Sequence, residues 1–235
     1  MRSPKELQPP EGKPNTNKRL GDPSRRHNVA SNRRVESVFL NIPYDAGFED
    51  LYLAYIVGLT LLGLQINAAL AVPNQGRLNT IIKLIEASDF SIHDLSRIEV
   101  SGGVPRFNMP VELGVALYRS HTTKGRHRVF IFESRRYRAQ RSTSDVNGID
   151  AQIHKGTPKG IMSGLRNVFR QAANVTTVPE MLASFRALKL RLPELRRNSG
   201  SKSLFEAAVF QDLSLAAMVE SQNLIARRKR DSRLG

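Results

Sequence analysis

The chain has 235 residues, of which 40% are hydrophobic and 24% are charged, proportions that are ordinary for a globular protein with a sizeable core. It contains no cysteine, which excludes disulfide frameworks, cysteine-ligated metals, iron–sulfur clusters and thiol catalysis. Residues 1–20 lack the apolar core of a signal peptide, and the longest apolar run, at residues 51–64, falls short of the roughly 20 residues that span a bilayer. We therefore expect a cytoplasmic protein that is neither secreted nor embedded in a membrane.

The net charge is +15 at pH 7, and most of it lies at the two ends of the chain. Residues 1–34 carry nine Lys and Arg against three Asp and Glu, and residues 184–235 carry eleven against five. Because a basic tail binds polyanions by releasing their counterions, these ends predict a nucleic-acid partner. For residues 1–34 a second interpretation stays open, in which the arm is disordered and simply solvated.

From residue 35 onward, short apolar runs alternate with apolar residues at helical spacing. The expected strands span residues 38–42, 66–72, 90–92 and 128–132, and the expected helices span residues 48–62, 78–85 and 110–119. This alternation predicts an α/β fold, a doubly wound parallel sheet with helices on both faces. In such sheets the functional site lies at the carboxyl ends of the strands.

The remainder of the chain has a helical pattern. We expect helices around residues 161–169, from Thr177 to about residue 191, and over residues 204–226. Thr177 and Glu180 have the spacing of a capping box, and the last helix ends in four basic residues that suit a helix C-terminus. The predicted organisation is a disordered basic arm at residues 1–34, an α/β domain at 35–175 and a helical extension with a basic end at 176–235.

The most informative stretch is residues 105–114, PRFNMPVELG. Pro110 suits the first turn of a helix, and Glu112 falls in that same turn. Its neighbours at helical spacing, Val115 and Ala116, are apolar, so this carboxylate is not expected to face open water. A shielded carboxylate of this kind is a candidate for shifted acidity or for stabilising a cation. In the alternative interpretation, Glu112 simply favours the helix dipole.

Two further segments follow expected strands. In residues 91–97, SIHDLSR, Asp94 is placed to hydrogen-bond a sugar hydroxyl, as acids at strand ends do in nucleotide-binding sheets. His93 has the alternative interpretation of a buried, satisfied histidine. In residues 41–45, NIPYD, the backbone amides of a turn can face a phosphate or a ribose. This turn has no G-x-G-x-x-G pattern, so nothing supports dinucleotide redox chemistry.

Residues 144–150, SDVNGID, resemble part of a calcium loop. The glutamate that closes such a loop is missing, and His154 does not replace it. We therefore interpret this segment as a turn-forming loop and predict no metal site.

Four segments together resemble the nucleoside 2-deoxyribosyltransferase-like proteins of bacteria, relatives of TIR-type NAD-cleaving domains. They are residues 38–45 (VFLNIPYD), 91–97, 105–114 and 144–150. The resemblance covers about residues 35–173 and implies a flavodoxin-like sheet and cleavage of an N-glycosidic bond. It also implies that Glu112, in Glu-Leu-Gly, is the catalytic carboxylate and that Asp94 contacts the nucleoside. Some members of this group are toxic effectors of bacterial antiphage systems, including retrons.

Residues 106–110, RFNMP, replace the Asp- and Gly-rich turn of authentic deoxyribosyltransferases. Hydrolysis of a nucleotide or NAD-like molecule and exchange of the base therefore both stay open. We expect an N-glycosidic bond hydrolase or transferase without a cofactor, in which NAD or a nucleotide is the substrate. Asn108, Tyr44 and Ser91 are expected as further substrate contacts.

Two other functions stay open at this point. One is a nucleotide-sensing module with the same fold and no turnover, and the other is a basic scaffold protein that binds nucleic acid or an acidic partner. The fold alone does not decide among them. In each case we expect a homo-oligomer or a subunit of a larger complex.

Overall fold

The computed structural model describes residues 34–71, 76–98, 107–136, 149–172, 174 and 176–232. The chain divides into two units, residues 1–34 and residues 35–235. The predicted basic arm lies outside the described residues, apart from Arg34. All the helices and strands of the described residues belong to the second unit.

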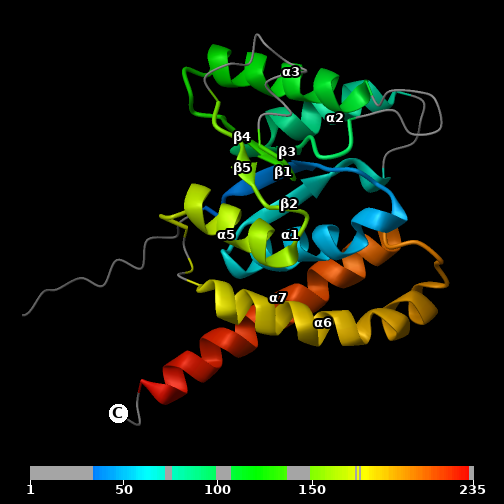
Figure 1. Ribbon diagram of the computed structural model, residues 1–235, viewed down its shortest axis with the longest axis vertical. Coiled ribbons are helices and arrows are strands. Elements are labelled where there is room, and N and C mark those ends of the chain that lie inside the picture. Colours follow the sequence, from blue (N-terminus) through cyan, green and yellow to red (C-terminus); the bar gives the residue numbers. More distant parts are fainter. Residues whose placement is uncertain are drawn as a thin grey trace, which may run out of the picture. The chain divides into compact units, whose positions relative to one another are not determined.

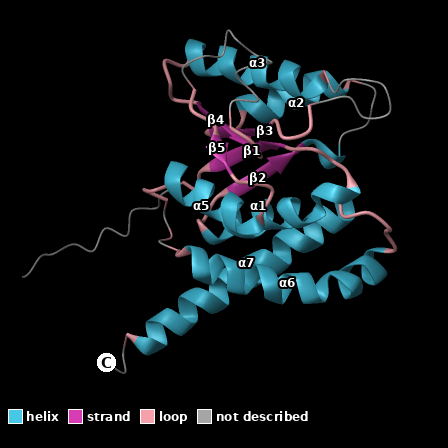
Figure 2. Cartoon of the chain, viewed as in Figure 1, coloured by secondary structure: helices cyan, strands magenta, loops and turns pink. Residues whose placement is uncertain are grey.

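A single sheet of five parallel strands forms the centre of this unit (Figure 2). The strands are β1 (Ser37–Asn41), β2 (Gln65–Ala68), β3 (Phe90–Asp94), β4 (Arg128–Glu133) and β5 (Gln152–Ile153). Their order in the sheet is β2-β1-β3-β4-β5, and every neighbouring pair is parallel. This confirms the predicted α/β class. The strand order is that of flavodoxin-like folds, in which β2 lies on one side of β1 and the later strands lie on the other, so the strand order reverses between β1 and β3.

Helices cover both faces of the sheet (Figure 1). They are α1 (Glu49–Leu61), α2 (Arg77–Glu86), α3 (Asn108–Thr122), α5 (Pro158–Val168), α6 (Val178–Ser199) and α7 (Ala207–Asp231), with short 3₁₀ turns η1 (Ala46–Phe48) and η2 (Ala69–Ala71). Helices α2 and α3 lie on one face, and α1 and α5 lie on the other. Beyond α1, helices α6 and α7 form a further layer.

Helix α1 differs from its expected amphipathic form. Every residue from Leu51 to Leu61 is buried, because the sheet lies on one side of the helix and α6 and α7 lie on the other. A helix that is apolar on all sides needs such a central position. At Gly58, a Cβ atom would lie 2.6 Å from Cδ1 of Leu165, so the missing side chain allows α5 to pack closely against α1.

The C-terminal helices are part of the same hydrophobic core as the sheet. Leu188 of α6 and Leu213 of α7 have no exposed surface, and they belong to one buried cluster with Leu40 of β1 and Tyr55 of α1. The predicted helical extension therefore completes the core over α1. Within the described ranges, no helix is long and apolar enough to span a bilayer.

The predicted capping box at the start of α6 is confirmed. The Thr177 hydroxyl oxygen accepts from the Glu180 amide, and a carboxylate oxygen of Glu180 accepts from the Thr177 amide at 2.7 Å. Thr177→Ala is expected to lower the free energy of unfolding by about 1 kcal/mol, because helix amides lose their acceptor. Urea unfolding checks this, with Thr177→Ser as the control that keeps the hydroxyl. An alanine variant as stable as the wild type would contradict the prediction.

Candidate functional site

The site begins where β1 and β3 end side by side. Asn41 and His93 are register partners at the carboxyl ends of these strands, and both are buried. The side-chain amide of Asn41 donates to Nδ1 of His93 at 3.0 Å and to the backbone oxygen of Met109 at 3.3 Å. Asn41 thus holds the first turn of α3 at the carboxyl ends of β1 and β3, where the strand order of the sheet reverses.

His93 is neutral in this environment. Burial, followed by the nearby His127, lowers the pKa of His93 to about 3. Because its Nδ1 accepts the Asn41 hydrogen bond, the ring proton lies on Nε2. Among the described residues, that Nε2 has no hydrogen-bond partner. His93 is therefore buried, as the alternative interpretation expects, but only one of its two ring nitrogens has a hydrogen-bond partner among the described residues.

Helix α3 begins earlier than predicted. It starts at Asn108, two residues before Pro110, so Glu112 is the fifth helical residue and no acid occupies the first turn. The dipole of a helix acts mainly through the unpaired amides of its first turn. The interpretation of Glu112 as an acid that simply favours the helix dipole therefore fits poorly. Glu112 instead lies on the buried face of α3 with Met109 and Leu113.

The Glu112 carboxyl has an environment that favours its neutral form. Its residue is 5% exposed, and burial raises its pKa to about 7, while the positive charge of Arg77 acts in the opposite direction. No hydrogen bond from another described residue reaches this carboxyl. A carboxyl group that is buried, poorly paired and able to ionise near neutral pH is typical of functional sites.

Tyr44 lies close enough to Glu112 to interact with it electrostatically. Burial and then the charge of Glu112 raise the pKa of Tyr44, and Arg77 works against this rise. The Tyr44 hydroxyl therefore stays protonated and can donate a hydrogen bond. Its ring packs against Phe205 at the start of the C-terminal extension, with ring centroids 5.7 Å apart. The cluster of Tyr44, Arg77 and Glu112 thus joins the turn after β1, the start of α2 and the second turn of α3.

Asp94, at the end of β3, has no exposed surface and both of its oxygens have partners. The Tyr55 hydroxyl donates to Oδ2 at 2.7 Å, and the Ser96 amide donates to Oδ1 at 3.0 Å. Nε2 of His154 lies 3.2 Å from Oδ2 and 2.9 Å from the Ser96 hydroxyl. Since Nδ1 of His154 accepts from the Gly156 amide at 3.1 Å, a neutral His154 carries its proton on Nε2.

This network connects β3 with α1 and with the turn after β5. It gives Asp94 a well-defined structural role, because a buried carboxylate needs donors around it. Its expected role as a sugar contact stays a prediction, since a substrate hydroxyl would have to replace one of these donors.

The other predicted residues lie at different places. Asn108 is exposed at the first position of α3, next to the Glu112 turn. Ser91 lies in the first half of β3, and its hydroxyl pairs with Nε2 of His127 at 2.8 Å, while the other ring nitrogen donates to the Ser88 oxygen. The structure thus brings together Glu112 and Tyr44 with Asn108 nearby, whereas Ser91 lies toward the amino end of β3.

The predicted turn-forming loop lies almost wholly outside the described residues, because only its last two residues, 149 and 150, are described. In the part of the chain that the structure describes, no group of three or more His, Asp or Glu residues is arranged to hold a metal ion.

Two contributors to the site were missed in the sequence. Arg77 is the first residue of α2, and nothing in the sequence connects it with Glu112. Arg97 joins the segment after β3 to the turn after β1. Its Nη1 lies 3.4 Å from Oδ1 of Asp45, and its Nη2 donates to the Gly47 oxygen at 3.3 Å. A basic residue shortly after one strand and an acid shortly after its neighbour were a usable signal for this second contact.

Comparison with known proteins adds no family, because neither a protein-family model nor a curated protein matches this sequence.

Proposed function

We propose that this protein cleaves the N-glycosidic bond of a nucleoside, nucleotide or NAD-like molecule, with Glu112 as the catalytic carboxylate. The observation that carries the proposal is the Glu112 carboxyl itself. It is buried beside the carboxyl ends of β1 and β3, and its pKa is raised to about 7. The resemblance of residues 105–114 to deoxyribosyltransferase-like proteins supports the same role.

The chemistry requires one ionised carboxylate. When the bond between C1′ and the base nitrogen breaks, its electron pair leaves with the base and the sugar gains oxocarbenium character. Ionised Glu112 either stabilises this cation or attacks C1′ to form a glycosyl ester, which water or a second base then opens. A neutral leaving base takes a proton from water, whereas nicotinamide leaves NAD without needing one.

The surroundings of Glu112 suit this step. A carboxylate in a site of low polarity interacts strongly with a developing positive charge, because little water screens the pair. The protonated Tyr44 hydroxyl can donate to a sugar oxygen. The exposed side chain of Asn108 is available to the base or the sugar.

The first test of the proposal is base release. Purified protein is incubated with NAD and with a panel of nucleosides and nucleotides, and free base is measured by liquid chromatography. Release from at least one substrate by the wild type, and its loss in Glu112→Gln, would support the proposal. If no substrate yields free base, the sensing interpretation without turnover is favoured instead.

The partners form a second part of the proposal. Near the end of helix α7, Arg227, Lys229 and Arg230 are exposed, whereas Arg228 is paired with Glu180. A basic helix end of this kind can bind a polyanion in a salt-dependent way. We infer a cytoplasmic protein whose basic ends bind nucleic acid, in a homo-oligomer or a larger complex. The resemblance extends this inference to a toxic effector of an antiphage system.

Replacing Asp94 tests whether the buried network supports the reaction. Asp94→Asn is expected to lower kcat/KM by at least about tenfold, because the amide group withdraws one acceptor from charge-assisted hydrogen bonds worth roughly 1.5–3 kcal/mol each. Steady-state kinetics with separate kcat and KM values measure the effect. Asp50→Asn, the same substitution at an exposed position of α1, is the control with kinetics near the wild type. Wild-type kinetics in a folded Asp94→Asn variant would return Asp94 to a purely structural role.

A further inference from the structure

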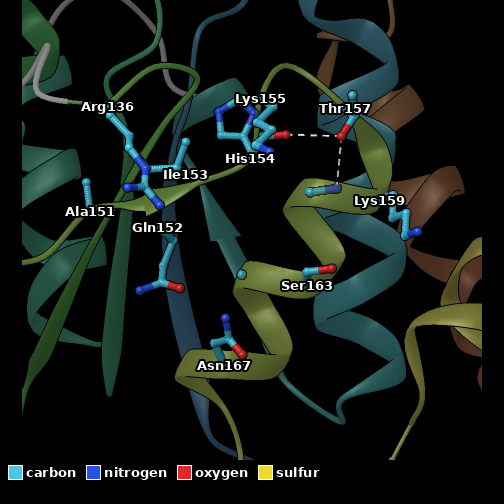
Figure 3. A pocket seen from close by; sticks show the side chains of 12 residues that line it. Arg136, Ala151, Gln152, Ile153, His154, Lys155, Thr157, Lys159, Ser163 and Asn167 are labelled. Atoms are coloured by element: carbon cyan, nitrogen blue, oxygen red, sulfur yellow. Dashed lines mark hydrogen bonds between the residues drawn. The ribbon is translucent and has the colours of Figure 1, made fainter.

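A groove of about 500 Å³ lies between the edge strand β5 and helix α5 (Figure 3). It is separate from the site around Glu112, because α5 covers the face of the sheet opposite to α3. Strand β4 and the end of β3 also lie between the two places. The groove therefore needs an explanation of its own.

The described lining of the groove carries positive charge. Arg136, Lys155 and Lys159 line it, and none of its twelve described lining residues is an acid. Within the described ranges, no ion pair engages these three cations. Like charges gathered around one cavity repel one another, so an anion between them would be bound favourably.

The rest of the lining offers polar groups without charge. Gln152 of β5 and the α5 residues Ser163 and Asn167 contribute amide and hydroxyl groups to the same groove (Figure 3). These side chains both donate and accept hydrogen bonds. The groove thus combines cationic side chains from the segment after β4, the turn after β5 and the first turn of α5 with neutral polar side chains from β5 and α5.

The close packing of α5 maintains this groove. A Cβ atom on Gly160 would lie 1.9 Å from the backbone oxygen of His154, so only glycine allows this approach of the helix to the turn after β5. The first turn of α5 is already capped, because the Gly160 amide donates to the Thr157 hydroxyl at 3.0 Å. The Gly160 amide is therefore not available to an anion, which would bind mainly through the three cationic side chains.

We propose that this groove binds the phosphate groups of a nucleotide-sized ligand, with Arg136, Lys155 and Lys159 on the phosphates. Its volume falls within the roughly 300–1,000 Å³ of small-molecule sites. A groove for single-stranded nucleic acid normally offers aromatic side chains on which bases stack, and no Phe, Tyr or Trp is present in the described lining. The observations therefore favour a small phosphorylated molecule over a nucleic-acid strand.

His154 joins this groove to the buried network at the end of β3. The residue lines the groove, while Nε2 of its ring contacts Asp94 and Ser96. A ligand held by the adjacent Lys155 would restrain this turn. The proposed phosphate site is thus in direct contact with the residues that hold Asp94, although its binding does not require Glu112.

The test measures binding of pyrophosphate and ADP by isothermal titration calorimetry with the full chain. The double variant Lys155→Gln/Lys159→Gln is expected to bind both probes at least about tenfold more weakly than the wild type. The control double variant Lys83→Gln/Lys202→Gln removes the same charge from two other exposed positions and should bind normally. Glu112→Gln should bind pyrophosphate, which has no glycosidic bond, with wild-type affinity, and this separates the proposed phosphate site from the proposed reaction.

Thermal unfolding confirms that each variant is folded before binding is compared. Unchanged affinity in the Lys155→Gln/Lys159→Gln variant would overturn the proposal, as would the failure of the wild type to bind either probe at millimolar concentration. A short oligothymidylate forms the third arm. If it binds through the same two lysines and pyrophosphate does not displace it, the groove is a nucleic-acid site and the proposal is wrong.

Discussion

Glu112→Gln is expected to release free base about 100 to 1,000 times more slowly than the wild type, while the protein stays folded. Glutamine has nearly the same shape as glutamate, and Glu112 lies on a buried face of α3 where shape matters. The amide, however, carries no charge and can neither stabilise an oxocarbenium ion nor attack C1′. The loss should appear in kcat, because the interaction forms mainly in the transition state.

Two comparisons make this experiment specific. Glu86→Gln, at an exposed position of α2, also removes one carboxylate and should keep wild-type turnover. In the wild type, the rate should rise with pH through about 7, since burial raises the pKa of Glu112 to about that value and the ionised form is the active one. Turnover near the wild-type rate in Glu112→Gln would end the assignment of this residue.

The sheet and the buried position of Glu112 were predictable because both depend on local patterns. The apolar runs that form β1, β3 and β4 are short and bounded by turns or polar residues, and the apolar residues Val115 and Ala116, at helical spacing from Glu112, predicted that this carboxylate does not face open water. In a parallel sheet, the carboxyl ends of adjacent strands necessarily share one edge. The proximity of Asn41 to His93 therefore follows from strand order, whereas strand order does not place Glu112, which lies on helix α3.

Other features depend on contacts that no local pattern contains. Strand β5 has only two residues, too few to show any alternation. Helix α1 was expected to have a polar face, yet its outer side is covered by helices more than a hundred residues further along the chain. His154 was considered only as part of a failed metal loop, because its partner Asp94 is 60 positions away in the sequence.

The site also depends on the C-terminal extension in a way that the predicted domain division does not suggest. Phe205, just before α7, packs against the rings of both Tyr44 and Tyr52. Tyr44 is in turn the neighbour of Glu112. A partner that displaces the start of α7 would therefore remove the contact between Phe205 and Tyr44, and so change the surroundings of the proposed catalytic carboxylate.

The stability of the protein should carry the same signature of Glu112 as its activity. Burial raises the pKa of this carboxyl from 4.5 to about 7, so between these values the folded state binds a proton that the unfolded state has lost. The contribution of protonated Glu112 to the free energy of unfolding is therefore fully present below about pH 4.5 and is lost as the pH rises through about 7. At 1.36 kcal/mol for each pKa unit, the decline amounts to about 3 kcal/mol.

Glutamine at position 112 is neutral at every pH and does not undergo this loss. Glu112→Gln is thus expected to match the wild type in free energy of unfolding near pH 4.5 and to exceed it by about 3 kcal/mol near pH 8. Urea unfolding at the two pH values measures the difference, in which all other titrating groups cancel, and Glu86→Gln should show almost none. A Glu112→Gln variant that is less stable than the wild type near pH 8 would mean that donors hold the ionised carboxylate in the folded state. A variant that gains stability while losing base release would show that the Glu112 carboxylate lowers the stability of the folded protein but is needed for the reaction, as expected for a catalytic carboxylate.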